Sequence, residues 1–129
     1  MTEAPNLLCI VDDDPSVRRA LGRMVKSLGF EVLLLASGRE CLDSPHIDRV
    51  TGLILDVSMP GMDGFELHAL LQASGRSVPT VFISAHDDEA YRAKARSVGA
   101  VAFLNKPCDE RLLRDAVDNA LASYDAPMP

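Results

Sequence analysis

The sequence predicts an α/β fold in which helices cover both faces of one parallel β-sheet. Five short apolar runs recur along the chain, and each is rich in branched side chains and too short for a helix. Their apolarity is continuous, which is typical of strands buried on both faces. Helical patterns lie between the runs, so strand and helix alternate five times, as in a doubly wound parallel sheet. The runs are LLCIV from Leu7, VLLL from Val32, LIL from Leu53, TVFI from Thr80 and VAFL from Val101.

The first helix is expected directly after the first apolar run. Asp14 suits the N-cap, Pro15 the first helical position, and Gly29 the residue that ends the helix. Apolar residues recur between them at helical spacing and therefore form one face of the helix: Val17, Leu21, Met24, Val25 and Leu28.

The other helical segments differ in strength. Residues 37–45 form a short segment after the second run, and residues 87–98 form an alanine-rich, weakly amphipathic one. Asp63 is the expected cap of the third helix, which Leu67, Leu70 and Leu71 mark. The last helix carries an apolar stripe: Leu113, Ala116, Val117, Ala120 and Leu121.

Length and composition limit the class of protein. The 129 residues suit a single domain with its core at about 6–123, and residues 124–129 are expected to be a tail or the start of a linker. The net charge of -6 argues against direct binding of nucleic acid or an anionic membrane by this domain. The N-terminus has no signal-peptide pattern, and no apolar run reaches the length of a membrane span.

The cysteines and histidines give no sign of a metal site. Cys9, Cys41 and Cys108 are scattered, with neither metal-ligand spacing nor a disulfide framework, which favours the reducing cytoplasm. His46 and His68 have no metal-ligand partners at useful spacing, so we expect both on the surface.

Reactive side chains gather where the strands are expected to end. The first run ends on Asp12 and Asp13, the third on Asp56 and the fourth on Ser84, and Lys106 follows the fifth. Functional sites in open parallel sheets lie at the carboxyl ends of the strands. If the first and third strands are neighbours, the three carboxylates converge, and they stay ionised together only if a cation compensates them. Hard carboxylate oxygens with room for water suit Mg²⁺.

A metal, an ammonium and a hydroxyl around one carboxylate can bind a phosphoryl group. The metal and the lysine would neutralise charge on its oxygens, and Asp56 would be the nucleophile that forms an acyl phosphate. Several of these side chains also have simpler explanations. Asp14 is better explained as a cap than as a ligand, Asp12 and Asp13 alone could be turn residues, and Phe103 could equally be a core residue.

The chain resembles the receiver domains of bacterial two-component response regulators. The segments VDDDPSVR, LDVSMPGMDG, FISAH, GAVAFLNKP and LLRDAVDNAL occur in the order and spacing of that family, over roughly residues 6–123. ISAH together with GAVAFLNKP is most similar to receivers that often precede helix-turn-helix output domains. The resemblance implies a flavodoxin-like, doubly wound five-stranded sheet with strand order 2-1-3-4-5.

The same resemblance implies the acceptor and the metal ligands. Asp56 would accept the phosphoryl group and also bind Mg²⁺. Asp13 would contact the metal directly, Asp12 mostly through water, and Ser58 through its backbone carbonyl.

It also implies how the phosphoryl group is bound and sensed. Ser84 and Lys106 would contact the phosphoryl oxygens, and Ser84 with the aromatic Phe103 would form the switch. Ser58 and His86 lie where side chains can tune hydrolysis. Serine at position 84 replaces the more frequent threonine, and Cys108 replaces a usual aromatic residue, but neither change removes a reactive group.

These features predict a phosphorylation-activated signalling switch. A sensor histidine kinase or a histidine phosphotransfer protein would donate the phosphoryl group, and the domain would catalyse only its own phosphorylation and dephosphorylation. The fourth helix, fifth strand and fifth helix would form the output face, used by a homodimer or by a docked partner. A phosphatase of the haloacid dehalogenase type needs an aspartate where this chain has Ser58. An interaction module that never binds phosphate is disfavoured because Asp13 and Lys106 are both present.

Overall fold

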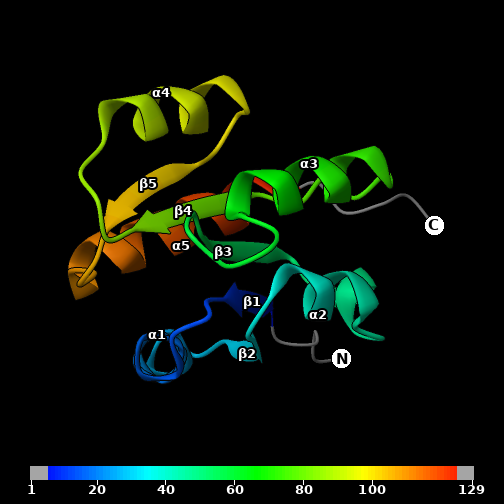
Figure 1. Cartoon of the computed structure of the whole chain (residues 1–129). Helices are drawn as coiled ribbons and strands as arrows, with labels where there is room; N and C mark the ends of the chain where they lie inside the picture. The colour runs from blue at the N-terminus through cyan, green and yellow to red at the C-terminus, as the bar shows by residue number, and fades with distance from the viewer. Residues whose placement is uncertain (1–5, 125–129) are drawn as a thin grey trace.

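The structure, a computed structural model of the chain, describes residues 6–124. Five parallel strands form one sheet in the order β2-β1-β3-β4-β5, with helices on both faces (Figure 1). The strands are β1 (Leu7–Val11), β2 (Glu31–Leu35), β3 (Gly52–Asp56), β4 (Thr80–Ser84) and β5 (Ala102–Asn105). The helices are α1 (Pro15–Ser27), α2 (Gly38–Asp43), the 3-10 turn η1 (Ile47–Arg49), α3 (Gly64–Ala73), α4 (Glu89–Ser97) and α5 (Glu110–Ser123).

The predicted fold class and strand order are therefore confirmed. Of the predicted tail, residues 125–129 lie outside the part of the chain that the structure describes. Within the described part, no helix combines the length and the apolarity needed to cross a membrane.

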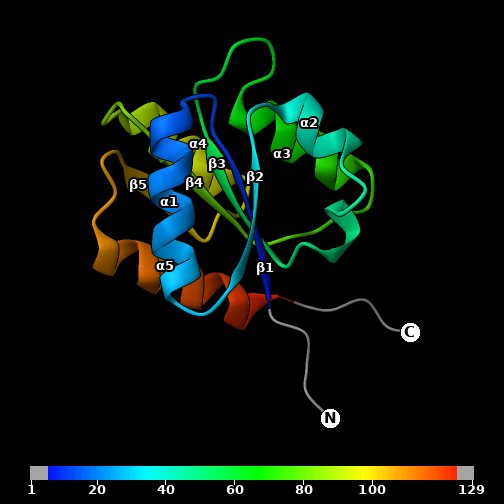
Figure 2. The same cartoon turned by 90° about the horizontal axis from the view of Figure 1, so that it is seen from below.

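The core lies in two layers, one on each face of the sheet. Strand side chains alternate between the layers, so Leu8 and Ile10 of β1 face one layer while Cys9 and Val11 face the other. Helices α1 and α5 cover the first layer and α2 and α3 the second (Figure 2), where α4 also packs. The helix residues buried in the two layers are Leu21, Val25, Leu113, Ala116 and Val117 in the first, and Cys41, Phe65, Leu67, Leu71 and Ala95 in the second.

Burial differs between central and edge strands. Every residue of β1, β3 and β4 is buried, as the continuous apolar runs predict. The expectation is wrong for β2, where Glu31 and Leu34 are exposed, and for β5, which is only partly buried. Both strands lie at an edge of the sheet, where a neighbouring strand covers one side only.

The predicted N-cap residues are found at the start of the first and third helices. The Asp14 carboxylate accepts hydrogen bonds from the backbone N–H groups of Ser16 and Val17, at 2.8 and 3.4 Å. Asp63 and Glu66 form a reciprocal capping box at the start of α3. Gly29 follows the first helix with a φ of +98°, a backbone conformation that glycine adopts readily.

The predicted orientation of α3 needs two corrections. Leu70 is 46% exposed, whereas His68 is buried at 5% exposure and lies edge-on to Phe82. The inward face of the helix is formed by Leu67, His68 and Leu71, which places position 70 outward. His46 is exposed, as predicted.

Two of the cysteines are neighbours despite their separation in sequence. Cys9 of β1 and Cys41 of α2 are both completely buried in the second core layer. A hydrogen bond with Cys41, together with burial, raises the pKa of the Cys9 thiol. All three cysteines are free thiols, and the fold brings Cys9 and Cys41 together although they are far apart in the sequence.

Candidate functional site

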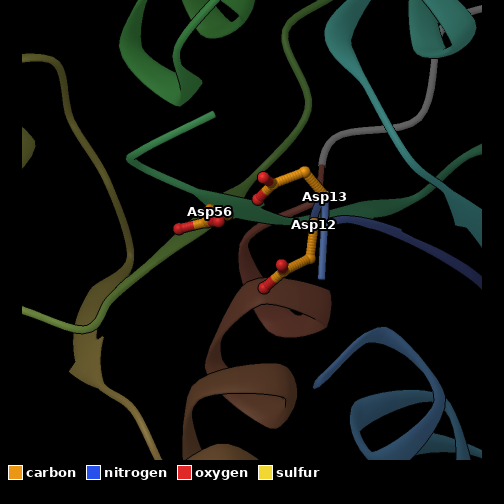
Figure 3. A group of neighbouring side chains, drawn as sticks. All are labelled: Asp12, Asp13 and Asp56. Atoms are coloured by element: carbon orange, nitrogen blue, oxygen red, sulfur yellow. The ribbon is translucent and has the colours of Figure 1, made fainter. Parts of the chain in front are cut away.

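Three carboxylates meet at the carboxyl ends of β1 and β3. Asp12 and Asp13 directly follow β1, and Asp56 is the last residue of β3, its neighbour in the sheet. One oxygen of each carboxylate lies within 4.8 Å of the others (Figure 3). Asp12 and Asp56 are buried and Asp13 is exposed, so one side of the cluster opens to solvent. The predicted convergence of these residues is confirmed.

Lys106 places a positive charge against two of the carboxylates. Its Nζ lies 2.9 Å from Asp12 Oδ2 and 3.2 Å from Asp56 Oδ2. The lysine follows β5, and its backbone N–H donates to the Ser84 carbonyl at 2.8 Å, which aligns the ends of β4 and β5. The peptide bond between Lys106 and Pro107 is cis.

The cluster holds more acidic groups than basic ones, and this affects the pKa values of Asp56 and Lys106. Burial, and then the charge of Asp12, raise the pKa of Asp56 to about 6, although Lys106 and the N–H of Ser58 at 3.3 Å oppose the rise. Burial acts to lower the pKa of Lys106, but a hydrogen bond to Asp12 and the two carboxylate charges outweigh burial and leave that pKa raised. Three carboxylates thus face one ammonium.

The donor set fits a hard divalent cation. Asp12 Oδ1 accepts the N–H of Asp14 at 2.8 Å, whereas the buried Asp12 Oδ2 contacts only Lys106 Nζ, at 2.9 Å, among the polar groups of the described residues. Carboxylate oxygens that converge beside solvent are the ligands that Mg²⁺ prefers, because it keeps several of its waters. A divalent cation would also offset the excess negative charge.

The turn after β3 holds the Asp56 backbone in place. Gly61 has a φ of +78°, and the N–H of Gly64 donates to the Val57 carbonyl at 3.0 Å. At Gly64, a Cβ atom would collide with the backbone carbonyl of Asp56. Gly61 therefore supplies a backbone angle that other residues rarely adopt, whereas Gly64 is needed for close approach.

Ser84 lies at the same edge of the sheet as the carboxylates. Register pairs Asp56 with Ile83, so Ser84 is one residue further along β4. The Ser84 side chain is fully buried, and its Oγ accepts the N–H of His86 at 3.0 Å. The hydroxyl is therefore engaged within the β4–α4 loop in this state. His86 and Ser58 are both exposed.

Phe103 is neither a complete core residue nor a surface residue. It packs against the second core layer from β5 and is only partly buried. The guanidinium carbon of Arg92 lies 5.1 Å from the centre of its ring and covers the outer face.

Two arginines near the site were not predicted. Arg18 donates through Nη1 to the backbone carbonyl of Asp12 at 2.7 Å, and Arg92 joins α4 to β5. Arg18 lies one helical turn after the Asp14 cap, so helical spacing could have placed it near the strand end. No sequence pattern pairs Arg92 with a residue of β5, because that contact joins segments brought together only by the fold.

Comparison with known proteins agrees with this geometry. The family model of the response regulator receiver domain matches residues 8–118. Nodulation protein W of Bradyrhizobium diazoefficiens is 38% identical over 111 residues, which are 86% of this chain and 49% of that protein. A response regulator receiver protein from Burkholderia phymatum is 39% identical, with a TM-score of 0.79 over 95% of this chain and 99% of that one. FixJ-N is 28% identical, with a TM-score of 0.85 over 97% and 100% of the two chains.

The chain spans about half the length of the curated relatives it matches. Response regulators act in two-component signalling, in which sensor kinases are their partners and phosphorylation activates the receiver domain. Receivers of this family bind Mg²⁺ at an acidic pocket, and the cluster of Asp12, Asp13 and Asp56 is the corresponding pocket here. Since the match extends across almost all of the described residues and the acidic pocket lies where the fold places such sites, the chain belongs to the response regulator receiver domains.

Proposed function

We propose that this domain is a signalling switch whose phosphoryl acceptor is Asp56. The observation that carries the proposal is the position of Lys106, whose Nζ bridges Asp12 Oδ2 and Asp56 Oδ2 at 2.9 and 3.2 Å. Asp12 is held by the shorter contacts, 2.8 Å from the N–H of Asp14 and 2.9 Å from Lys106, whereas Asp56 accepts the N–H of Ser58 at 3.3 Å and is the less engaged nucleophile. Asp13 is exposed and has no contact with the lysine among the described ion pairs.

The reaction transfers a phosphoryl group from phosphohistidine to this carboxylate. An oxygen of Asp56 attacks phosphorus in line with the phosphorus–nitrogen bond, which breaks as the new phosphorus–oxygen bond forms, and the donor imidazole leaves with the electron pair and takes up a proton. Lys106 neutralises one developing negative charge on the phosphoryl oxygens, and the Ser84 hydroxyl donates to another after leaving the His86 N–H.

Mg²⁺ would be held by Asp13 and Asp56 directly, by the Ser58 backbone carbonyl, and by Asp12 through water. When bound, the metal supplies charge neutralisation for the acceptor and for the phosphoryl oxygens. Dephosphorylation is a separate reaction, in which water attacks the phosphorus, the bond between phosphorus and the Asp56 oxygen breaks, and the carboxylate is restored with release of phosphate. Ser58 and His86 are exposed beside this path and would tune the access of water.

The surroundings of the switch follow from the same proposal. The donor is a sensor histidine kinase or a histidine phosphotransfer protein of the cytoplasm. The output surface is formed by α4, β5 and α5, where Phe103 lies, and it is read by a second copy of the domain or by a docked partner. The domain acts on no external substrate, and it makes no direct contact with nucleic acid.

Intact-mass spectrometry tests the proposal without a kinase. The protein is incubated with Mg²⁺ and either acetyl phosphate or phosphoramidate, and one added phosphoryl group is expected. Asp56→Asn should abolish the addition, whereas Asp118→Asn, which changes an exposed carboxylate of α5, should leave it unchanged. Labelling of Asp56→Asn at the rate of the unmodified chain would disprove the assignment.

A further inference from the structure

One arginine ties the β4–α4 loop to β5. The side chain of Arg92 in α4 donates to Asp87 Oδ1 through Nε at 3.0 Å and through Nη2 at 2.7 Å. The same Nη2 donates to Asn105 Oδ1 at the end of β5. The face of the guanidinium covers the Phe103 ring. We refer to the three side chains of Arg92, Asp87 and Asn105 as the Arg92 latch.

The latch is connected to the phosphoryl-binding side of the sheet through His86. The N–H of His86 donates to Ser84 Oγ at 3.0 Å, and its carbonyl accepts Asn105 Nδ2 at 3.1 Å. Ser84 and Asn105 are register partners, and Asn105 directly precedes Lys106. The backbone of His86 is therefore bonded to Ser84 through its N–H and to Asn105 of the latch through its carbonyl.

We propose that the Arg92 latch holds the output face in its unphosphorylated arrangement and is released when Ser84 turns to the phosphoryl group. This inference rests on the proposed function of Asp56. To reach a phosphoryl oxygen, Ser84 has to rotate its Oγ away from the loop, and this rotation removes the acceptor of the His86 N–H. The β4–α4 loop then shifts and carries the His86 carbonyl and Asp87 with it. This movement strains the hydrogen bond from Asn105 to the His86 carbonyl and those from Arg92 to Asp87. Arg92 leaves the Phe103 ring, which becomes free to change its position.

The latch is weak enough to act as a switch. Asp87 is 77% exposed at its side chain and Arg92 is 32% exposed, and ion pairs with such exposure contribute little. Contact of the guanidinium with the partly exposed ring adds a similar small amount. Loss of both should raise the population of the activated arrangement by roughly three- to tenfold, which is within the range that one ligand can impose.

Coupling of this kind is reciprocal. If the latch opposes the arrangement that binds a phosphoryl group, then removing the latch must raise the affinity for that group by the same factor. Arg92 is a positioning residue in this scheme, because it touches neither Asp56 nor Lys106 among the described contacts. A purely structural role would lower stability without changing that affinity.

Amide chemical shifts of the full chain test the proposal. Beryllofluoride with Mg²⁺ serves as the phosphoryl mimic and is titrated into the unmodified chain, Arg92→Gln and Arg96→Gln. Arg96 is the matched control, since it lies on the same helix and, among the described residues, pairs only with the exposed Glu89. Before beryllofluoride is added, amide signals of residues 84–105 in Arg92→Gln should lie displaced toward the saturated positions of the unmodified chain, and its affinity should be at least about threefold higher.

A second variant guards against misfolding. Asp87→Asn weakens the latch from the loop side and should displace the same signals in the same direction, while Arg96→Gln should displace none of them toward saturation. The proposed role of the latch is overturned if both Arg92→Gln and Asp87→Asn keep the amide signal positions and the beryllofluoride affinity of the unmodified chain. That result leaves the proposed function intact if the unmodified chain still responds to beryllofluoride. Failure of the unmodified chain to gain a phosphoryl group on Asp56 would instead refute the proposed function.

Discussion

Replacing Asp56 with asparagine is expected to stabilise the metal-free, unphosphorylated fold. Burial and the charge of Asp12 raise the pKa of Asp56 from its usual 3.8 to about 6. A rise of that size corresponds to about 3 kcal/mol of lost stability at neutral pH, as an order of magnitude. Asparagine keeps the shape and removes the charge, so the free energy of unfolding should rise by about 1–3 kcal/mol.

The direction of the pH dependence follows from the same pKa. Because the folded state holds this proton more tightly than the unfolded state, the penalty is absent below pH 3.8 and develops as the pH rises through about 6. At about pH 5 the stability difference between Asp56→Asn and the unmodified chain should therefore be roughly half of its value at about pH 7.5. Added Mg²⁺ should also reduce the difference, since the cation compensates the carboxylates.

Urea denaturation followed by circular dichroism measures these differences. The two proteins are compared at about pH 7.5 and about pH 5 with a chelator, and again at the higher pH with Mg²⁺. Asp118→Asn serves as the control, because its carboxylate is exposed and its removal should change stability by less than about 0.5 kcal/mol. The reasoning is refuted if Asp56→Asn is no more stable than the unmodified chain, or if its advantage is the same under all three conditions.

Three further predictions concern His68, Gly64 and Asp13. Burial lowers the pKa of His68 from its usual 6.5, so the unfolded chain takes up a proton that the folded chain excludes. The free energy of unfolding should therefore fall as the pH drops below 6.5. If urea denaturation gives His68→Leu and the unmodified chain the same dependence of stability on pH, the prediction is contradicted. Gly64→Ala forces a Cβ against the Asp56 carbonyl and should cost about 1–3 kcal/mol and slow phosphorylation, which thermal melts and a mass time course measure; unchanged values of both would count against the clash. Asp13→Ala should prevent labelling by acetyl phosphate at ordinary Mg²⁺ levels while changing stability by less than about 0.5 kcal/mol, because the side chain is exposed; labelling at the unmodified rate would exclude Asp13 as a metal ligand.

Local patterns were sufficient to predict the elements and most of the acidic site. The caps Asp14 and Asp63 act through backbone groups within three residues, so the sequence alone shows them. The carboxylates converge because parallel strands end at one edge of the sheet, and Asp12 and Asp56 stand at the ends of strands that the apolar runs identify. Only the adjacency of those two strands had to be supplied by the family resemblance.

The tertiary structure decided how individual side chains are used. His68 is buried because α3 packs with that side inward, and a helix with apolar residues on several sides does not reveal its orientation. The Ser84 hydroxyl bonds to its own loop, although its position beside the carboxylates follows from the strand order. Arg92 meets Asn105 across thirteen residues, and the match depends on where α4 packs against β5. Interactions between residues close in the sequence, such as helix caps, can be predicted from the sequence alone. Contacts between distant segments exist only after the chain has folded, because packing alone brings those side chains within bonding distance.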